Sequence, residues 1–137
     1  MIINSVFCQI SLKQARAFAI EYVNNSKIEN YIIYNKTQIN TSSTVITTAN
    51  KSFYSKTQSS WAFFIDKNPL LKTPHSCIFL FVDENSSNIE VIDSDSPPID
   101  LALWDKMNDF PQTELTGNTL KSGISPDNCY AVIISGG

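Results

Sequence analysis

Glycine, arginine and histidine are scarce in this chain of 137 residues, which has four glycines, one arginine and a single histidine, His75. The phosphate-binding patterns G-x-x-x-x-G-K-[ST] and G-x-G-x-x-G are absent, as is the G-x-S-x-G pattern of serine hydrolases. Ten Lys and Arg residues stand against 13 Asp and Glu residues, and the basic residues form no stripe. We therefore expect neither a nucleotide-binding loop nor a nucleic-acid partner.

Long apolar runs are also missing. The longest runs have about six residues, against the roughly 20 that a helix needs to cross a bilayer. With 42% hydrophobic and 17% charged residues and a mean hydropathy of -0.09, the composition is that of a folded globular domain. The length is sufficient for one domain with its own core. We expect no membrane span.

The three cysteines, Cys8, Cys77 and Cys129, form no C-x-x-C pair. The usual zinc-binding and redox spacings are therefore absent. Because free cysteines are commonly buried, one interpretation is three buried thiols. The alternative is a Cys77–Cys129 disulfide formed in an oxidising compartment.

The patterns at both ends of the chain predict that it belongs to a longer protein. The first residues, MIINSVFCQ, resemble the last part of a secretory signal, and a short N-terminal strand is the alternative for residues 1–10. The last residues, NCYAVIISGG, contain an apolar, β-branched run typical of a strand buried in a parallel sheet. Because a parallel strand needs neighbours reached by crossovers, we expect residues 129–137 to be the first strand of a further domain.

The body of the chain predicts a helix followed by antiparallel strands. Residues 11–24 carry a capping box, Ser11 and Gln14, and an apolar stripe at spacings of three and four. Short apolar segments predict strands at residues 28–34, 44–48, 52–56, 61–65, 78–82 and 89–92, the last two as a hairpin.

The remaining segments complete the domain plan. Two prolines in DSDSPPID interrupt the sheet, and a short helix is expected at residues 101–107. Residues 11–108 form one α+β domain, with the helix packed on one face of an antiparallel sheet. The polar residues 109–128 predict a linker between this domain and the C-terminal strand.

Few residues able to perform chemistry lie close together in the sequence. His75 and Cys77 would share one face of a strand, but no third group that would orient a catalytic dyad is evident. These two residues with a carboxylate would make a metal site, of which only two ligands can be named. The acidic residues Asp93, Asp95 and Asp100 lack the glycine and glutamate of a calcium-binding loop and predict a solvated turn. We assign no catalytic, metal-binding or cofactor-binding residue, and we do not expect an enzyme.

The strands at residues 61–65 and 78–82 are apolar on both faces. One helix covers only one face of a sheet, so the second face predicts another cover. We expect this cover to be another domain or a partner protein that contacts Trp61, Phe63, Phe79 and Phe81.

Residues 60–93, SWAFFIDKNPLLKTPHSCIFLFVDENSSNIEVID, resemble a module of secreted proteins from Bacteroidetes-type bacteria. The pattern of the module is W-x-F-F-I-D, a proline, an H-P-C preceded by a tryptophan, an aromatic strand and an acidic turn. In that family the module precedes a caspase-like cysteine peptidase of the legumain and gingipain kind, whose first strand is similar to YAVIISGG at residues 130–137. This chain departs from the pattern at residues 73–77, where TPHSC replaces W-x-H-P-C.

The resemblance implies a secreted or periplasmic, non-catalytic pro-region. Such a segment covers the active site of a cysteine peptidase domain or assists its folding, either in the same chain or as a separate protein. The catalytic His and Cys of these peptidases follow the first strand, so no catalytic residue is carried over. Cleavage would release the pro-region, and Lys106, Lys121 and Asn128 are the candidate processing sites.

Two other functions are compatible with the sequence. The first is a free-standing secreted binding module, such as a small inhibitor or an immunity-type protein. The second is a ubiquitin-like modifier that uses the terminal Gly136-Gly137, although these glycines follow a predicted strand directly and lack an extended polar tail.

Overall fold

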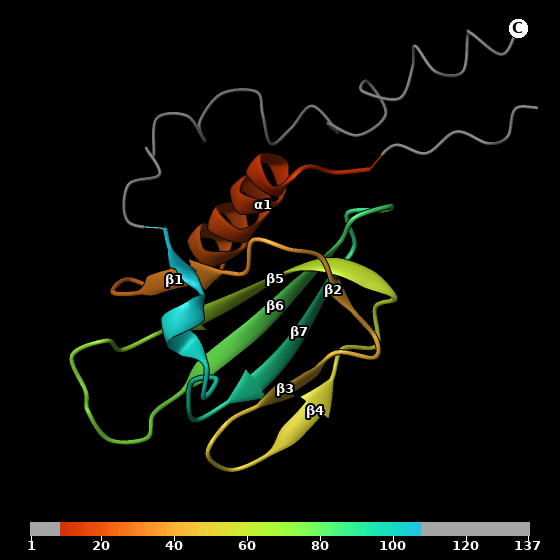
Figure 1. Ribbon diagram of the computed structural model, residues 1–137. Coiled ribbons are helices and arrows are strands. Elements are labelled where there is room, and N and C mark those ends of the chain that lie inside the picture. Colours follow the sequence, from red (N-terminus) through yellow and green to blue (C-terminus); the bar gives the residue numbers. More distant parts are fainter. Residues whose placement is uncertain (1–8, 108–137) are drawn as a thin grey trace, which may run out of the picture.

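The computed structural model describes residues 9–107, and residues 1–8 and 108–137 lie outside this part of the chain. The predicted signal or strand at the N-terminus, the linker at 109–128 and the strand at 129–137 thus lie largely or wholly outside it. The described part contains one α-helix, a six-stranded antiparallel sheet and a separate two-stranded hairpin (Figure 1). This arrangement confirms the predicted α+β class.

Helix α1 (Leu12–Asn25) begins at the predicted capping box. Ser11 Oγ accepts the backbone N–H of Gln14 at 3.1 Å, and the Gln14 side chain accepts the backbone N–H of Ser11 at 3.0 Å. Two backbone donors that the helix cannot satisfy internally are therefore paired. Within residues 9–107, no helix has the length and apolar character needed to cross a membrane.

The C-terminal cap of α1 shifts the start of the first strand to a later residue than predicted. Lys27 adopts a left-handed φ of 58°, and the N–H of Ile28 donates back to the carbonyl of Val23 at 3.3 Å. This is the hydrogen bond of a Schellman cap, with lysine in the position that glycine usually occupies. Because the cap uses Ile28, the strand predicted at residues 28–34 begins only at Ile32, as β1 (Ile32–Asn35).

The sheet has the spatial order β7-β6-β5-β1-β8, and every pairing in it is antiparallel. Its long central strands are β5 (Ser59–Asp66) and β6 (Cys77–Asp83), and β6 forms the predicted hairpin with β7 (Ile89–Ser94). The short strand β2 (Asn40–Thr41) pairs with the start of β5. Strand β7 is thus one end of the sheet.

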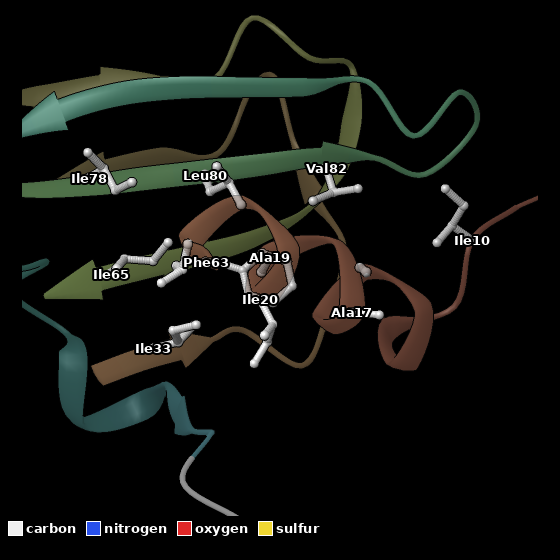
Figure 2. Packing of buried hydrophobic residues seen from close by; sticks show 12 residues of the cluster. Ile10, Ala17, Ala19, Ile20, Ile33, Phe63, Ile65, Ile78, Leu80 and Val82 are labelled. Atoms are coloured by element: carbon white, nitrogen blue, oxygen red, sulfur yellow. The ribbon is translucent and has the colours of Figure 1, made fainter. Parts of the chain in front are cut away.

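Helix α1 packs on one face of the sheet (Figure 2). Its buried residues are small or branched, and they lie over side chains of β1, β5 and β6. This helix-side cluster consists of Ile10, Ala15, Ala17, Ala19, Ile20, Val23, Ile33, Phe63, Ile65, Ile78, Leu80 and Val82. Trp61 packs at its border and donates its indole N–H to the carbonyl of Ile10 at 2.7 Å.

The hairpin of β3 (Val45–Thr47) and β4 (Ser52–Tyr54) covers the opposite face of the sheet. The hairpin-side cluster consists of Ile46, Ala62, Phe64, Cys77, Phe79, Phe81 and Trp104, with Phe53 packed against it. The cover that we assigned to a partner is therefore supplied by the chain itself. Phe63, Phe79 and Phe81 have an exposed fraction of 0%, so the prediction that these side chains face a partner is wrong.

The helix predicted at residues 101–107 is replaced by a 3₁₀ turn (Leu101–Leu103) and strand β8 (Asp105–Lys106). Trp104 lies between them, buried with its ring centroid 6.3 Å from that of Phe79. Because this indole is buried, the chain lies against the sheet at this point, and β8 pairs with β1. Contact with the core thus outweighs the local helical pattern.

Candidate functional site

The acidic residues of the DSDSPPID loop do not converge on one point. The Asp95 carboxylate accepts the side-chain amide of Asn50 at 2.7 Å, and the Asp100 carboxylate accepts the indole N–H of Trp104 at 3.0 Å. Each is held by a different part of the chain. Within residues 9–107, the group of three potential metal-binding side chains that do lie together is Asp66, His75 and Cys77.

The sheet brings these three residues together, and we call them the Asp66–His75–Cys77 cluster. Asp66 is the last residue of β5 and Cys77 the first residue of β6, and the two face each other across the antiparallel pair. The N–H of Glu84 donates to the carbonyl of Ser59, so these two residues form a hydrogen-bonded pair. Hydrogen-bonded and non-hydrogen-bonded pairs alternate along the β5–β6 ladder, and Asp66–Cys77 is a non-hydrogen-bonded pair. Side chains approach most closely in such pairs, where the Cα atoms are about 4.5 Å apart.

His75 is fixed at both ring nitrogens. Its Nδ1 lies 2.6 Å from the carbonyl oxygen of Thr73, and its Nε2 lies 2.6 Å from Oδ1 of Asp66. A carbonyl oxygen only accepts, so Nδ1 carries a proton. The hydrogen bonds to Thr73 and Asp66 raise the pKa of His75, because both favour the protonated ring.

Cys77 is not set up as a nucleophile. Burial is the main cause that raises the pKa of its thiol to about 11, and the Asp66 charge adds to the effect. The thiol donates to the carbonyl of His75 at 3.4 Å, and neither ring nitrogen of His75 is free to take its proton. A cysteine peptidase needs a thiolate paired with a histidine, so this arrangement does not form a catalytic dyad.

A cavity of about 260 Å³ opens beside the cluster. The loop between β5 and β6 forms one wall, and the loop after β7 forms the other. Asp66, His75 and Cys77 all line it, together with Leu71, Lys72, Thr73, Pro74, Asp95, Ser96, Pro97 and Leu101. Asp66 and His75 are partly exposed to this cavity, whereas Cys77 is buried at its inner wall with an exposed fraction of 1%.

Sequence reasoning named His75 and Cys77 but missed Asp66. The order of the two strands along the chain could have identified Asp66. Asp66 directly ends one apolar strand and Cys77 directly precedes the next, and consecutive antiparallel strands place the end of one beside the start of the other.

The second feature of interest is the free edge of strand β7. Among the described residues, β7 pairs with β6 on one side and with no strand on the other. The N–H of Asp83 donates to the carbonyl of Asn88 at 2.8 Å, which makes this a bonded pair. Alternation along the ladder then directs the backbone groups of Ile89, Val91 and Asp93 away from β6.

The residues along this edge differ in their exposure and in their contacts. Ile89 and Val91 lie beside the helix-side cluster, with exposed fractions of 37% and 39%. Lys51 donates to the outward carbonyl of Asp93 at 2.7 Å and so closes one end of the edge. The open stretch therefore combines two exposed apolar side chains with backbone groups at Ile89 and Val91 that pair with no strand within residues 9–107. We call it the β7 edge.

Glu90 anchors β7 on the hairpin side. Its carboxylate accepts the Ser55 hydroxyl at 2.7 Å, the Thr57 hydroxyl at 2.8 Å, and the backbone N–H groups of Lys56 and Thr57. Burial acts to raise the pKa of Glu90, but these hydrogen bonds together outweigh it and lower the pKa below its ordinary value. These hydrogen bonds hold the connection between β4 and β5 against strand β7.

The other residues singled out from the sequence are dispersed. Lys106 is exposed in the short strand β8, opposite Tyr34 of β1. Trp61 is half-buried at the border of the helix-side cluster, away from the Asp66–His75–Cys77 cluster. Lys121, Asn128, Cys129 and the terminal glycines lie outside the described residues.

Comparison of the chain with protein-family models, with curated proteins and with solved structures gives no match. The resemblance of residues 60–93 and 130–137 to peptidase pro-regions therefore stays a prediction.

Proposed function

We propose that this chain is a non-catalytic, pro-region-like domain that binds a caspase-like cysteine peptidase domain through the β7 edge. The observation that supports this proposal is the β7 edge itself, with its outward backbone groups and the exposed side chains of Ile89 and Val91. An extended segment of the peptidase would add as a further strand, with main-chain hydrogen bonds for affinity and apolar contacts for position.

A second property is consistent with this role. The core is closed on both faces, so a partner would meet a pre-formed surface. A rigid edge costs less ordering on association than a segment that must fold as it binds. A domain of this kind can hold a peptidase segment without supplying any catalytic group. The choice of a peptidase as partner rests on the resemblance of the two sequence segments.

The test uses the full chain and a panel of purified legumain-like and gingipain-like peptidases. We expect the wild-type chain to slow hydrolysis of a fluorogenic peptide or to raise the refolding yield of at least one peptidase. Val91→Lys places a charge on the β7 edge and should reduce that effect at least tenfold. The matched control is Val45→Lys, because Val45 is also an exposed valine (49%) but lies on β3.

Hydrogen exchange locates the contact independently of the peptidase assay. The amides of Ile89 and Val91 should exchange rapidly in the free chain and slowly in the complex. An absence of any effect on the whole panel contradicts the peptidase as partner. Equal effects of Val91→Lys and Val45→Lys contradict the β7 edge as the binding surface.

A free-standing binding module is the second candidate, and it is favoured by the self-contained core. Both sheet faces of the described domain are covered by its own helix and hairpin. This candidate predicts that the full chain is monodisperse in sedimentation and unfolds in one cooperative transition. It also predicts inhibition of a partner enzyme with no effect on that enzyme's refolding, which separates it from a pro-region.

A further inference from the structure

The structure assigns to the Asp66–His75–Cys77 cluster a transition-metal site, best suited to Zn²⁺, with the fourth coordination position open to the adjoining cavity. This inference does not depend on the proposed function. Its ligands are Oδ1 of Asp66, Nε2 of His75 and Sγ of Cys77, which all lie within 4.8 Å of one another. They come from three points of the chain that the β5–β6 pairing brings together.

The distances require only a small adjustment. Around a tetrahedral Zn²⁺ with usual bond lengths, ligand atoms are separated by roughly 3.3–3.8 Å. Nε2 and Oδ1 are now 2.6 Å apart because a proton joins them, and insertion of an ion in place of that proton would part them. Movements on the order of 1 Å at the ends of three side chains would complete the geometry.

The surroundings already orient two of the ligands. The Nδ1–H of His75 is held by the Thr73 carbonyl at 2.6 Å, which leaves Nε2 as the atom available to a metal. Oδ1 of Asp66 accepts the backbone N–H of Asn68 at 2.9 Å. Histidines that bind metals almost always donate their other ring N–H to a carbonyl or carboxylate, as His75 does here.

The donor set selects the kind of metal. A thiolate, an imidazole and a carboxylate together suit Zn²⁺, whereas Ca²⁺ and Mg²⁺ prefer oxygen ligands alone. Three protein ligands with a fourth position facing a cavity of about 260 Å³ are typical of zinc sites that keep a water or bind a small molecule. On binding, the ion replaces the Nε2 proton of His75 and the thiol proton of Cys77, and both protons pass to the solvent.

The proposal is tested on the full chain after reduction and removal of metal with a chelator. Titration with Zn²⁺ in a calorimeter should give one ion per chain. Titration with Co²⁺ should give a sulfur-to-metal charge-transfer band and the intense visible absorption of a tetrahedral site. Cys77→Ser should abolish the charge-transfer band, and Asp66→Asn should weaken binding more than about 100-fold, since loss of a group that merely orients a ligand costs 10–100-fold.

Matched variants separate this site from other thiols and carboxylates. The double variant Cys8→Ser/Cys129→Ser keeps Cys77 and should keep the band, and Asp93→Asn should bind like the wild type. His75→Gln repeats the ligand test at a side chain that is partly exposed, in case Cys77→Ser does not fold. Far-ultraviolet circular dichroism of each variant reports whether it is folded.

Three outcomes overturn the site. The first is the absence of a charge-transfer band in the reduced, folded wild-type chain. The second is a band that survives Cys77→Ser but disappears in the Cys8→Ser/Cys129→Ser variant. The third is a native disulfide at Cys77, detected by mass spectrometry of the purified chain before reduction.

Discussion

Replacing Glu90 should release the connection between β4 and β5 from the end of the sheet. The Glu90 carboxylate holds Ser55, Lys56 and Thr57 with bonds between residues 33 to 35 positions apart in the chain. In Glu90→Ala, the two hydroxyls and the Lys56 N–H lose this acceptor, whereas the Thr57 N–H keeps its hydrogen bond to Ser55 Oγ at 2.9 Å. Ser55 is only 2% exposed, so water replaces that acceptor poorly at its hydroxyl.

The expected cost follows from the kind of hydrogen bond. A hydrogen bond to a charged group contributes about 1.5–3 kcal/mol, but Glu90 is half-buried and water restores part of the loss. We expect Glu90→Ala to lower the free energy of unfolding by about 2–3 kcal/mol. Glu90→Gln keeps one acceptor oxygen but removes the charge, so its cost should be about 1 kcal/mol.

Urea unfolding at pH 7 measures both costs. The midpoint should fall by roughly 1–2 M for Glu90→Ala, given the usual dependence on urea for small proteins. Glu29→Ala is the matched control, because Glu29 is an exposed glutamate with no side-chain hydrogen bond among the described contacts. A Glu90→Ala midpoint equal to that of the control would refute the role of Glu90 as an anchor.

The same anchor predicts a dependence on pH. The pKa of Glu90 is lower in the folded chain than its ordinary value, so its charge stabilises the fold at every pH above that ordinary value. This contribution is lost as the pH falls through the folded pKa. The difference in stability between wild type and Glu90→Gln should therefore be full at pH 6 and should vanish in strong acid. A difference that is constant over this range would show that the charge itself contributes nothing.

Two further predictions concern the core and the helix start. Phe79→Ala should lower the free energy of unfolding by about 3–5 kcal/mol, measured in urea. The reason is that the Phe79 ring centroid lies 5.0 Å from that of Phe64 and 5.1 Å from that of Phe53. The control is Leu70→Ala, at an 86% exposed position, which should change the free energy of unfolding by less than about 0.5 kcal/mol. Ser11→Ala removes one half of the capping box and should cost about 1 kcal/mol. Loss of protection confined to the first turn of α1 in hydrogen exchange would support that assignment, and an unchanged midpoint would count against it.

Helix α1 and the β6–β7 hairpin could be predicted because their determinants are local. Ser11 and Gln14 lie three residues apart, and they specify the helix start without help from the rest of the chain. Similarly, two apolar strands around a polar turn specify their own antiparallel pairing. The class of the fold follows from these local elements.

The second cover of the sheet could not be predicted in the same way. The apolar pattern of β5 and β6 correctly indicated that both faces are buried, but it did not indicate by what. The β3–β4 hairpin lies 25 to 34 residues before Phe79 and Trp104 lies 25 residues after it, and only tertiary packing brings them together. The prediction that Phe79 and Phe81 face a partner was wrong for this reason.

Both candidate sites depend on strand order and register. By itself the sequence determined which residues are scarce, where α1 begins and which segments form the central strands. The tertiary structure decided that Asp66 stands opposite Cys77 and that, among residues 9–107, β7 pairs with one strand only. The Asp66–Cys77 contact joins two strand ends, and its free energy is gained only when β5 and β6 have paired.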